Sequence, residues 1–312
     1  MTGLRPLLCG VELGGSKCVC LIGTGPDDIG AQVSVPTGSD PSATLGRIEE
    51  VLRNWNAVYG PFSAIGLASF GPLDLRKDSP TFGHITSTVK PGWSGTDVVG
   101  RLTRHLGVPI GFNTDVNSAA LAESRWGLAR GLSDFAYITV GTGVGVGLVV
   151  GGKPVFGCNH TELGHMRIAR RRGDVWPGIC RFHGDCVEGL ASGPAIAARA
   201  GVSAEEIPDD SSVWELVAHA LAQLLHTIVL GTAPRCILVG GGVLQARPQI
   251  LGRVRRLLVE SLNGYLDLED LTGGMDRYVV APGLGALAGP LGALAIAADA
   301  YAEARAAQAR VP

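Results

Sequence analysis

Two cysteines and two histidines lie close together in the middle of the chain. They are His165, Cys180, His183 and Cys186, with the spacing H-x14-C-x2-H-x2-C. Thiolate and imidazole groups are the ligands that tetrahedral zinc prefers. The spacing matches no common zinc finger, and the alternative is two buried cysteines beside two unrelated surface histidines. We favour a zinc site, and because four protein ligands leave no open position for water, we expect it to be structural.

A glycine-rich turn between two apolar segments occurs twice. Glycine allows backbone N–H groups to approach a phosphate closely, so each turn is a candidate phosphate-binding site. Neither turn has the P-loop pattern, and the second is followed by a β-branched segment rather than a helix, which disfavours a Rossmann dinucleotide site. The candidate residues are Gly14, Gly15, Ser16 and Lys17 in the first turn and Thr139, Gly141, Thr142 and Gly143 in the second.

Either turn by itself is equally well explained as an ordinary hairpin turn. Their repetition in two halves of the chain favours a nucleotide held between two hairpins. A third glycine run, Gly240-Gly241-Gly242, ends an apolar segment. It is either a place where an adenosine lies on the backbone or a simple turn from a strand into a helix.

The composition limits the class of protein. A chain of 312 residues can form two domains or one large domain. With 46% hydrophobic and 17% charged residues it can bury a sizeable core, and its net charge of −2 gives no general preference for nucleic acid or an anionic membrane. Cys9, Cys18, Cys20 and Cys236 lie in apolar segments, which is typical of small buried side chains in a reducing cytoplasm.

Two apolar segments could be mistaken for membrane signals. The N-terminal MTGLRPLLCGVEL is a poor signal peptide, because its apolar part is short and is interrupted by Glu12. The segment APGLGALAGPLGALAIAA is rich in Gly and Ala and contains Pro290. We interpret it as a buried loop and helix rather than a membrane span.

The pattern of apolar residues predicts an α/β protein. Strands are expected at 7–13, 18–23, 64–70, 109–116, 236–242 and 277–282, with another strand–turn–strand at 136–150, and helices at 42–59, 117–127, 213–231 and 250–262. Because a strand–turn–strand unit followed by α/β elements occurs twice, we expect two α/β domains of similar plan with a cleft between them. The domains would be 1–115 and 116–285, with a C-terminal helix at 286–312 packing back on the first.

Eight segments, in order from residue 11 to about 243, together identify a resemblance. They are VELGGSK, ASFGPLDL, KPGWSGTDV, NTDVNSAALAESRWG, YITVGTGVGVG, NHTELGH, CRFHGDCVEGLASGPAI and ILVGGGV. This ordered set resembles the ROK family of sugar kinases, and within it the bacterial fructokinases. The resemblance implies a two-domain actin/hexokinase-like (ribonuclease H-like) fold, ATP and Mg²⁺, a structural Zn²⁺ and a homodimer.

The resemblance also assigns roles to individual residues. It makes Asp115 the catalytic base and places the sugar against Thr114, Asp115, Glu162, His165 and Glu188. The local alternatives are a helix cap for Asp115 and solvated surface positions for the two glutamates. Trp93 is either a sugar-stacking platform or a packed loop anchor, and the Arg170-Arg171-Arg172 run is typical of a solvated loop.

Two departures from the glucokinase pattern bear on the substrate. Glu12 stands where glucokinases have aspartate, as in related fructokinases, and Thr114 stands where they usually have asparagine. We therefore expect a cytoplasmic, ATP-dependent kinase that converts fructose to fructose 6-phosphate, without a nucleic-acid or membrane partner. One alternative is a kinase for another hexose such as mannose or glucose, and another is a zinc-stabilised binding module without catalysis. A third is a sugar-responsive regulator, but regulators of this family carry an N-terminal helix-turn-helix, which we do not expect here because the first phosphate turn begins by residue 14.

Overall fold

The computed structural model describes residues 6–104, 106–268 and 273–309. The chain divides into two compact units. Unit 1 contains the chain up to Arg130, the segment Phe156–His160 and the chain from Ala286 onward, and unit 2 contains Gly131–Val155 and Thr161–Gly285. The sequence placed this division near Asp115, whereas in the structure the helix that begins at Asp115 stays with unit 1. Residues 310–312 of the expected C-terminal helix lie outside the described residues.

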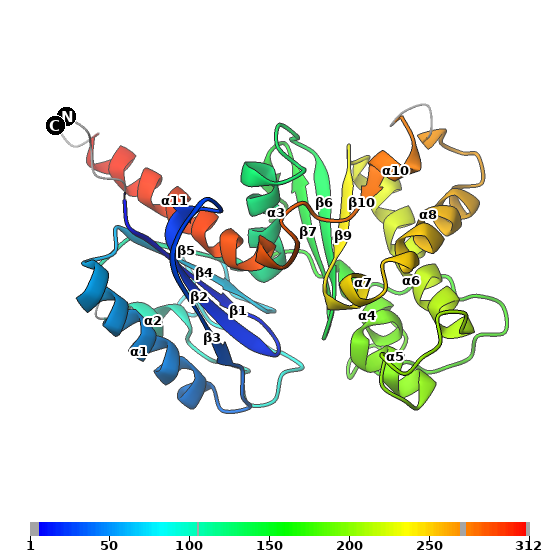
Figure 1. Cartoon of the computed structure of the whole chain (residues 1–312), viewed down its shortest axis with the longest axis horizontal. Helices are drawn as coiled ribbons and strands as arrows, with labels where there is room; N and C mark the ends of the chain where they lie inside the picture. The colour runs from blue at the N-terminus through cyan, green and yellow to red at the C-terminus, as the bar shows by residue number, and fades with distance from the viewer. Residues whose placement is uncertain (1–5, 105, 269–272, 310–312) are drawn as a thin grey trace. The chain divides into compact units, whose positions relative to one another are not determined.

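Unit 1 is built on a five-stranded sheet (Figure 1). Its strand order is β3-β2-β1-β4-β5, with β1–β2–β3 antiparallel and β1, β4 and β5 parallel. The strands are β1 (Leu8–Leu13), β2 (Lys17–Gly25), β3 (Asp28–Pro36), β4 (Ala64–Ser69) and β5 (Ile110–Thr114). The sequence did not predict β3, because it is a largely exposed edge strand without regular apolar alternation.

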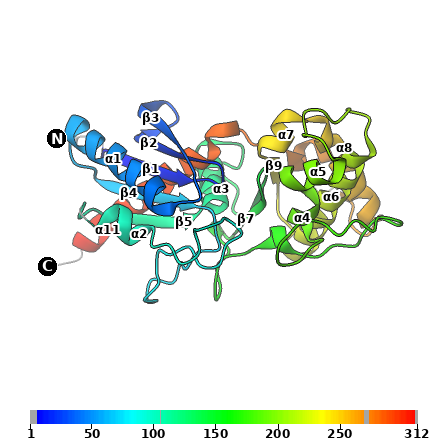
Figure 2. The ribbon, with the colours of Figure 1, turned by 90° about the horizontal axis from the view of Figure 1, so that it is seen from below.

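Helices cover both faces of this sheet (Figures 1 and 2). On one face α1 (Pro41–Tyr59) packs its apolar stripe against the sheet, beside the short α2 (Val99–Thr103). The stripe has helical spacing, and Asp40 caps the helix by accepting hydrogen bonds from Ser42 N and Ala43 N. On the other face lie α11 (Ala288–Gln308) and α3 (Asp115–Trp126), which pack on each other.

Helix α11 approaches the sheet of unit 1 very closely. Gly10 pairs with Gly66 and Gly66 pairs with Gly111, so the three glycines form a row across β1, β4 and β5. A Cβ atom at Gly10 would lie 2.9 Å from Leu294 N, and one at Gly66 or Gly111 would overlap carbonyl oxygens of α11. The row therefore exists because the backbone of α11 occupies the space that side chains would need.

Unit 2 repeats the strand plan of unit 1. Its sheet order is β10-β9-β6-β7-β8, again with an antiparallel hairpin, a third antiparallel strand and two parallel strands. This confirms the predicted repetition of one α/β plan. The strands are β6 (Phe135–Val140), β7 (Val144–Val150), β8 (Lys153–Pro154), β9 (Ile237–Gly240) and β10 (Val279–Val280).

The helices in the described part of unit 2 are α4 (Val187–Ala191), α5 (Gly193–Ala200), α6 (Ser212–Thr232), α7 (Gly242–Ala246), α8 (Gln249–Leu262) and α10 (Met275–Tyr278), with 3-10 turns η1 (Leu163–His165) and, in the connection between the units, η2 (Gly285–Leu287). Helix α6 lies in the core of the unit, and α4, α5 and α8 pack against it (Figure 1). The strand expected at 277–282 is wrong in part, since Arg277 and Tyr278 end a helix and only Val279 and Val280 form β10.

Two helical segments, Ser212–Thr232 and Gly285–Gln308, are long and apolar enough to cross a membrane by composition alone. Both helices are core elements of their units, because α6 lies within the apolar core of unit 2 and α11 lies on the sheet of unit 1. Burial inside the protein accounts for their apolar character, as was expected for the C-terminal segment.

The glycine row yields a direct test of the fold. Gly66→Ala should destabilise the protein by about 1–3 kcal/mol, because the added Cβ must displace the α11 backbone. Gly46→Ala in α1 is the matched control. Its Cβ would meet only Arg101 Nη2 at 3.8 Å, so helix propensity should make it neutral or stabilising by up to about 1 kcal/mol. Urea unfolding of both variants measures the difference, and equal stabilities would contradict the close approach of α11.

Candidate active site and metal cluster

Asp115 is the first residue of α3 and is half-buried. Thr114 forms the N-cap, with its Oγ1 accepting a hydrogen bond from Asn117 N at 3.1 Å. The alternative interpretation of Asp115 as a simple helix cap is therefore wrong. Asp115 Oδ1 accepts from Val116 N at 2.9 Å, yet burial outweighs this bond and raises the pKa of Asp115 to about 6.

A second carboxylate, Glu12 on β1, interacts with Asp115. Burial is the larger cause and the negative charge of Asp115 the next, and together they raise the pKa of Glu12 to about 7, against the opposing effect of Lys17. The Glu12 carboxylate lies against the first turn of α11, where a Cβ at Gly289 would overlap Glu12 Oε1. The two carboxyls therefore titrate as an interacting pair, and burial raises the pKa of each.

The first glycine turn connects β1 to β2 next to this pair. Gly14 N donates to Lys17 O at 3.1 Å and closes the turn, and the side chains of Ser16 and Lys17 are exposed. Unit 1 therefore brings Glu12, the turn and Asp115 together, as the sequence proposed for the turn and Asp115. Thr114 is only 4% exposed, so its contribution to any ligand site is to position Asp115 through the cap.

Trp93 was left open between a sugar platform and a loop anchor, and it is the anchor. Its side chain is fully buried, its Nε1 donates to Gly38 O at 2.9 Å, and its ring meets Phe70 edge-on with centroids 5.2 Å apart. A fully buried ring has no face available for stacking on a ligand. Its function is to hold the loop before α2 against the segment after β3.

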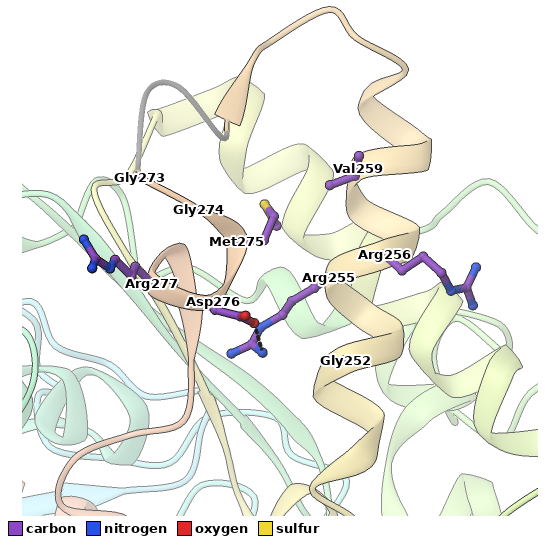
Figure 3. Close-up of a pocket in the computed structure, with 9 residues that line it drawn as sticks. All are labelled: Gly252, Arg255, Arg256, Val259, Gly273, Gly274, Met275, Asp276 and Arg277. Carbon is purple, nitrogen blue, oxygen red and sulfur yellow. Dashed lines mark hydrogen bonds and ion pairs between the residues drawn. The ribbon is translucent and has the colours of Figure 1, made fainter.

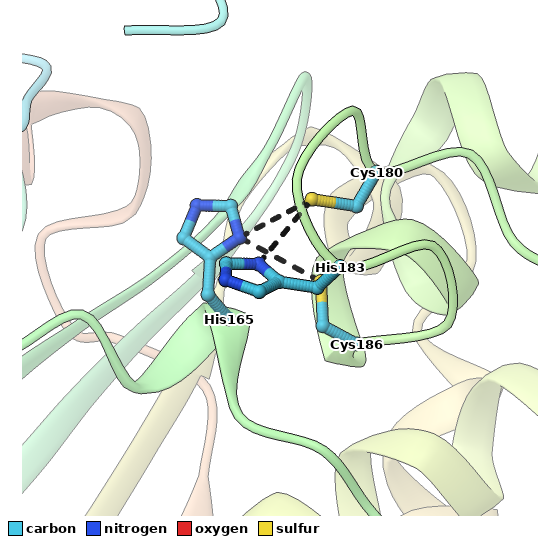
Figure 4. Close-up of side chains that lie close together, drawn as sticks. All are labelled: His165, Cys180, His183 and Cys186. Carbon is cyan, nitrogen blue, oxygen red and sulfur yellow. Dashed lines mark hydrogen bonds between the residues drawn. The ribbon is translucent and has the colours of Figure 1, made fainter. Parts of the chain in front are cut away.

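Unit 2 brings together the four side chains that the sequence predicted as metal ligands (Figure 4). The ligand atoms of His165, Cys180, His183 and Cys186 all lie within 4.8 Å of one another. His165 Nδ1 lies 3.6 Å from both cysteine sulfurs, and His183 Nδ1 lies 3.6 Å from Cys180 Sγ. Both imidazoles thus direct Nδ1 toward the cysteine sulfurs, so these four side chains could hold a metal ion.

Glu188 links the cluster to the second glycine turn. Its Oε2 accepts from Val144 N at 3.1 Å, and its Oε1 lies 3.8 Å from His165 Nε2. A carboxylate on the outer nitrogen of a metal-binding histidine fixes the orientation of the ring. Gly143 leaves room for this carboxylate, because a Cβ there would lie 2.5 Å from Glu188 Oε2. Glu188 is therefore not a solvated surface residue.

The other predicted residues of unit 2 fall at the ends of neighbouring strands. Thr139 pairs with Gly240 across β6 and β9, so the Gly141–Gly143 turn and the Gly240–Gly242 run begin side by side. Thr142 is exposed at the tip of the turn, and Glu162 is exposed directly before η1, which carries His165. The sequence could not show that these two glycine segments lie side by side in the sheet, because about a hundred residues separate them in the chain.

The expectation that the arginine run is a solvated loop is wrong in part, because Arg170 is half-buried, whereas Arg171 and Arg172 are exposed. Arg170 forms ion pairs with Asp174 at 2.9 Å and Asp185 at 2.8 Å, and Arg171 pairs with Glu215 at 3.3 Å. The two Arg170 pairs lie within the long loop between His165 and Cys186, and the Arg171 pair ties this loop to α6. Only the alternation of Arg and Asp around this loop could have indicated such pairing.

A further hollow in unit 2 contains none of the predicted residues (Figure 3). Two of its arginines already have partners, because Arg255 pairs with Asp276, and Arg256 pairs with Glu215 and Glu260. It is lined by Gly252, Arg255, Arg256, Val259, Gly273, Gly274, Met275, Asp276 and Arg277. We assign it no role in the candidate active site.

The raised pKa of Glu12 predicts a pH-dependent stability. A carboxyl with a raised folded-state pKa favours folding at low pH, and that contribution is lost as the pH rises from about 4.5 toward about 7. Glu12→Gln removes the charge, so its Tm relative to the wild type should be higher at pH 8 than at pH 5 by about 2–4 °C. Thermal unfolding at both pH values measures this, and the exposed Glu303→Gln is the control. A constant Tm difference would contradict the raised pKa.

Sequence comparison connects this geometry to known proteins. The ROK family model matches residues 8–300. A fructokinase from Pediococcus pentosaceus is 37% identical, covering 93% of this chain and 97% of the relative. A fructokinase from Zymomonas mobilis is 39% identical, covering 92% of this chain and 95% of the relative.

Structure comparison gives the same grouping. The crystal structure of a ROK hexokinase from Thermus thermophilus matches with a TM-score of 0.73 and 26% identity, covering 96% of this chain and 99% of the hexokinase. The repeated sheets are thus those of the actin/hexokinase-like fold, as the sequence resemblance implied. The family match, the relatives and the fold agree over nearly the whole chain, and the protein is a member of the ROK family.

Proposed function

We propose that this protein is an ATP-dependent fructokinase that forms fructose 6-phosphate. The observation that carries the proposal is Asp115, a half-buried carboxylate at the start of α3 with a pKa raised to about 6, beside a glycine turn suited to phosphate. The ROK relatives that are 37–39% identical over more than nine-tenths of this chain are named fructokinases, which favours fructose as the sugar.

Phosphoryl transfer to a sugar needs a base for the hydroxyl proton and an aligned phosphate. The Asp115 carboxylate accepts the proton of the 6-hydroxyl as that oxygen attacks the γ-phosphorus, and the bond from this phosphorus to the bridging oxygen breaks to release ADP. A base with a pKa near 6 is ionised at neutral pH and remains basic enough to take the proton.

The glycine turns are the proposed nucleotide site. Backbone N–H groups of the Gly14–Lys17 turn in unit 1 and of the Gly141–Gly143 turn in unit 2 would bind phosphate oxygens, with the Gly240–Gly242 run beneath the adenosine. Mg²⁺ would be carried on the phosphate oxygens of ATP and supply charge neutralisation.

Four of the predicted residues are proposed to bind the sugar. Asp115 in unit 1 and Glu162, His165 and Glu188 in unit 2 would bind the sugar hydroxyls, since carboxylates are strong acceptors for O–H donors. Glu162 is exposed, and Glu188 accepts a hydrogen bond from Val144 N and has one oxygen directed toward His165.

The metal cluster is proposed to hold Zn²⁺. Zinc bonds of about 2.3 Å to sulfur and 2.1 Å to nitrogen give a tetrahedral S···N edge of about 3.6 Å. The three S···N separations of 3.6 Å in the cluster fit this edge. With four protein ligands the ion would be structural and would fix the loops that carry Glu162 and Glu188.

Location and assembly are part of the same proposal. The seven cysteines are free, and six of them are buried, which is typical of a chain kept in a reducing cytoplasm. We propose a homodimer from the family resemblance alone. A kinase for another hexose is the second candidate, because the Thermus thermophilus ROK structure is a hexokinase.

The sugar is identified by an ADP-release assay across fructose, mannose and glucose, with and without Mg²⁺. Fructose should have the highest kcat/KM. A site that pairs the hydroxyls of fructose would leave a hydroxyl of glucose without a partner, and one unpaired buried polar group costs about 1–3 kcal/mol, which is about 5–150-fold in kcat/KM. Activity should require Mg²⁺. Equal kcat/KM values for glucose and fructose would contradict the assignment as a fructokinase and indicate a hexokinase of broad specificity.

Asp115→Asn tests the base. The amide keeps the size of the side chain but cannot accept the proton, so kcat should fall about 10²–10⁴-fold while fructose binding changes little. In the wild type, kcat/KM should fall as the pH drops below about 6, because Asp115 becomes protonated. The exposed Asp27→Asn is the control for loss of a carboxylate in unit 1. A near-normal kcat for Asp115→Asn would remove the assigned base.

Metal content tests the cluster. Elemental analysis should find about one zinc per chain in the wild type and less in Cys180→Ser or Cys186→Ser. Loss of a structural zinc should lower Tm by about 10 °C, because metal binding contributes directly to folding. Cys158→Ser is the matched control, since Cys158 is exposed and lies outside the cluster. Freshly purified protein without zinc would contradict the assignment.

A further inference from the structure

The backbone of the Gly14–Lys17 turn is held from one side. Each of its four carbonyl oxygens accepts a hydrogen bond from within unit 1. Thr37 Oγ1 donates to Gly14 O at 2.8 Å, and Thr37 N donates to Ser16 O at 3.0 Å. Gly14 N donates to Lys17 O at 3.1 Å, and the remaining carbonyl, that of Gly15, accepts from Lys90 Nζ at 2.7 Å.

Lys90 reaches this turn from a loop that is distant in sequence. Its half-buried ammonium also donates to Thr37 O at 3.1 Å, so it joins the turn to the residue that holds the other side of it. The loop of Lys90 is fixed three residues later by Trp93, which is fully buried and bonded to Gly38 O. Among the residues that the structure describes, no carboxylate forms an ion pair with Lys90, so its partners are these two carbonyls.

The direction of these carbonyls determines the direction of the neighbouring N–H groups. In a planar trans peptide the C=O and the following N–H point in opposite directions. Holding the carbonyls of Gly14, Gly15 and Ser16 toward Thr37 and Lys90 therefore directs the next three N–H groups to the other side. A Gly-Gly sequence by itself permits either orientation of its peptides, because glycine has little conformational restriction.

We propose that Lys90 is a positioning residue of the kinase, which locks the Gly15–Ser16 peptide so that the turn presents N–H groups to a nucleotide phosphate. Without this lock the peptide can reverse and present a carbonyl oxygen, which repels the phosphate. A charged donor suits the task, since hydrogen bonds from an ammonium are about twice as strong as neutral ones. This role rests on the proposed function, and it adds Lys90 to the residues that form the proposed nucleotide site.

Lys90→Met removes the donor and keeps an apolar stem of similar length. We expect kcat/KM for ATP to fall about 10–150-fold, the loss that follows removal of a hydrogen bond to a charged group, while KM for fructose changes less than about twofold. Lys77→Met is the matched control, because it removes the same charge from the same unit at a side chain that is 84% exposed. Lys90→Arg keeps a charged donor for the carbonyls of Gly15 and Thr37, so its kcat/KM for ATP should be at least about tenfold higher than that of Lys90→Met.

A double-mutant cycle separates locking of the turn from direct contact with the phosphate. Thr37→Val removes the hydroxyl that holds Gly14 O, so it acts on the same turn as Lys90→Met. If both residues lock the turn, the double variant should lose clearly less than the product of the two single losses. Full additivity, or an unchanged kcat/KM for ATP in Lys90→Met, would overturn the proposal. So would equal losses for ATP and for fructose, which indicate general misfolding.

Nucleotide binding distinguishes failure of this inference from failure of the proposed function. By calorimetry, Lys90→Met should weaken binding of ATP but not of adenosine, which has no phosphate. A wild type that binds ATP but phosphorylates no hexose would refute the fructokinase, and an ATP-specific loss in Lys90→Met would still support the lock. An active wild type whose Lys90→Met variant binds ATP normally would refute the lock alone.

Discussion

The close packing of α11 on the sheet of unit 1 is the constraint on which the candidate active site depends. The helix lies across β1, which carries Glu12, and packs on α3, which begins with Asp115. The glycine row in β1, β4 and β5 admits its backbone, and a Cβ at Gly292 would overlap the backbone of Ser118 in α3. Since packed interiors do not deform continuously, the position of one helix fixes both carboxylates.

That packing also sets the charge state of the site. Burial against the sheet and α11 raises the pKa values of both Asp115 and Glu12, and the two negative charges oppose each other. Bringing two carboxyls together in this way disfavours folding at neutral pH, so a structure selected for stability alone would not retain them. In exchange for this loss of stability, the arrangement provides a base that is ionised near neutral pH and can still accept a proton.

Unit 2 holds its functional side chains by a different device. The chain between the metal ligands His165 and Cys186 forms little regular structure, and its backbone cannot be fixed by a sheet. The four-residue cluster and the ion pairs of Arg170 fix it instead. Glu188 then bridges this region to the second glycine turn through Val144 N. The second unit thus adds directional bonds to apolar packing in a segment with little regular structure, where Met166, Ile168 and Trp176 pack against the core.

The repeated α/β plan, the four candidate metal ligands and the glycine turns could be predicted from the sequence, because each is a local pattern of residue types. The sequence also pointed to Asp115, but only through the ordered set of family segments, since the start of a helix is by itself typical of a cap. Contacts in the folded protein were needed to show that Thr114 is that cap, that Trp93 is a buried anchor, that Arg170 is paired, and that Lys90 holds the first turn. These depend on contacts between segments far apart in the chain, such as Lys90 with Gly15, and no local pattern encodes which distant carbonyl a side chain will meet.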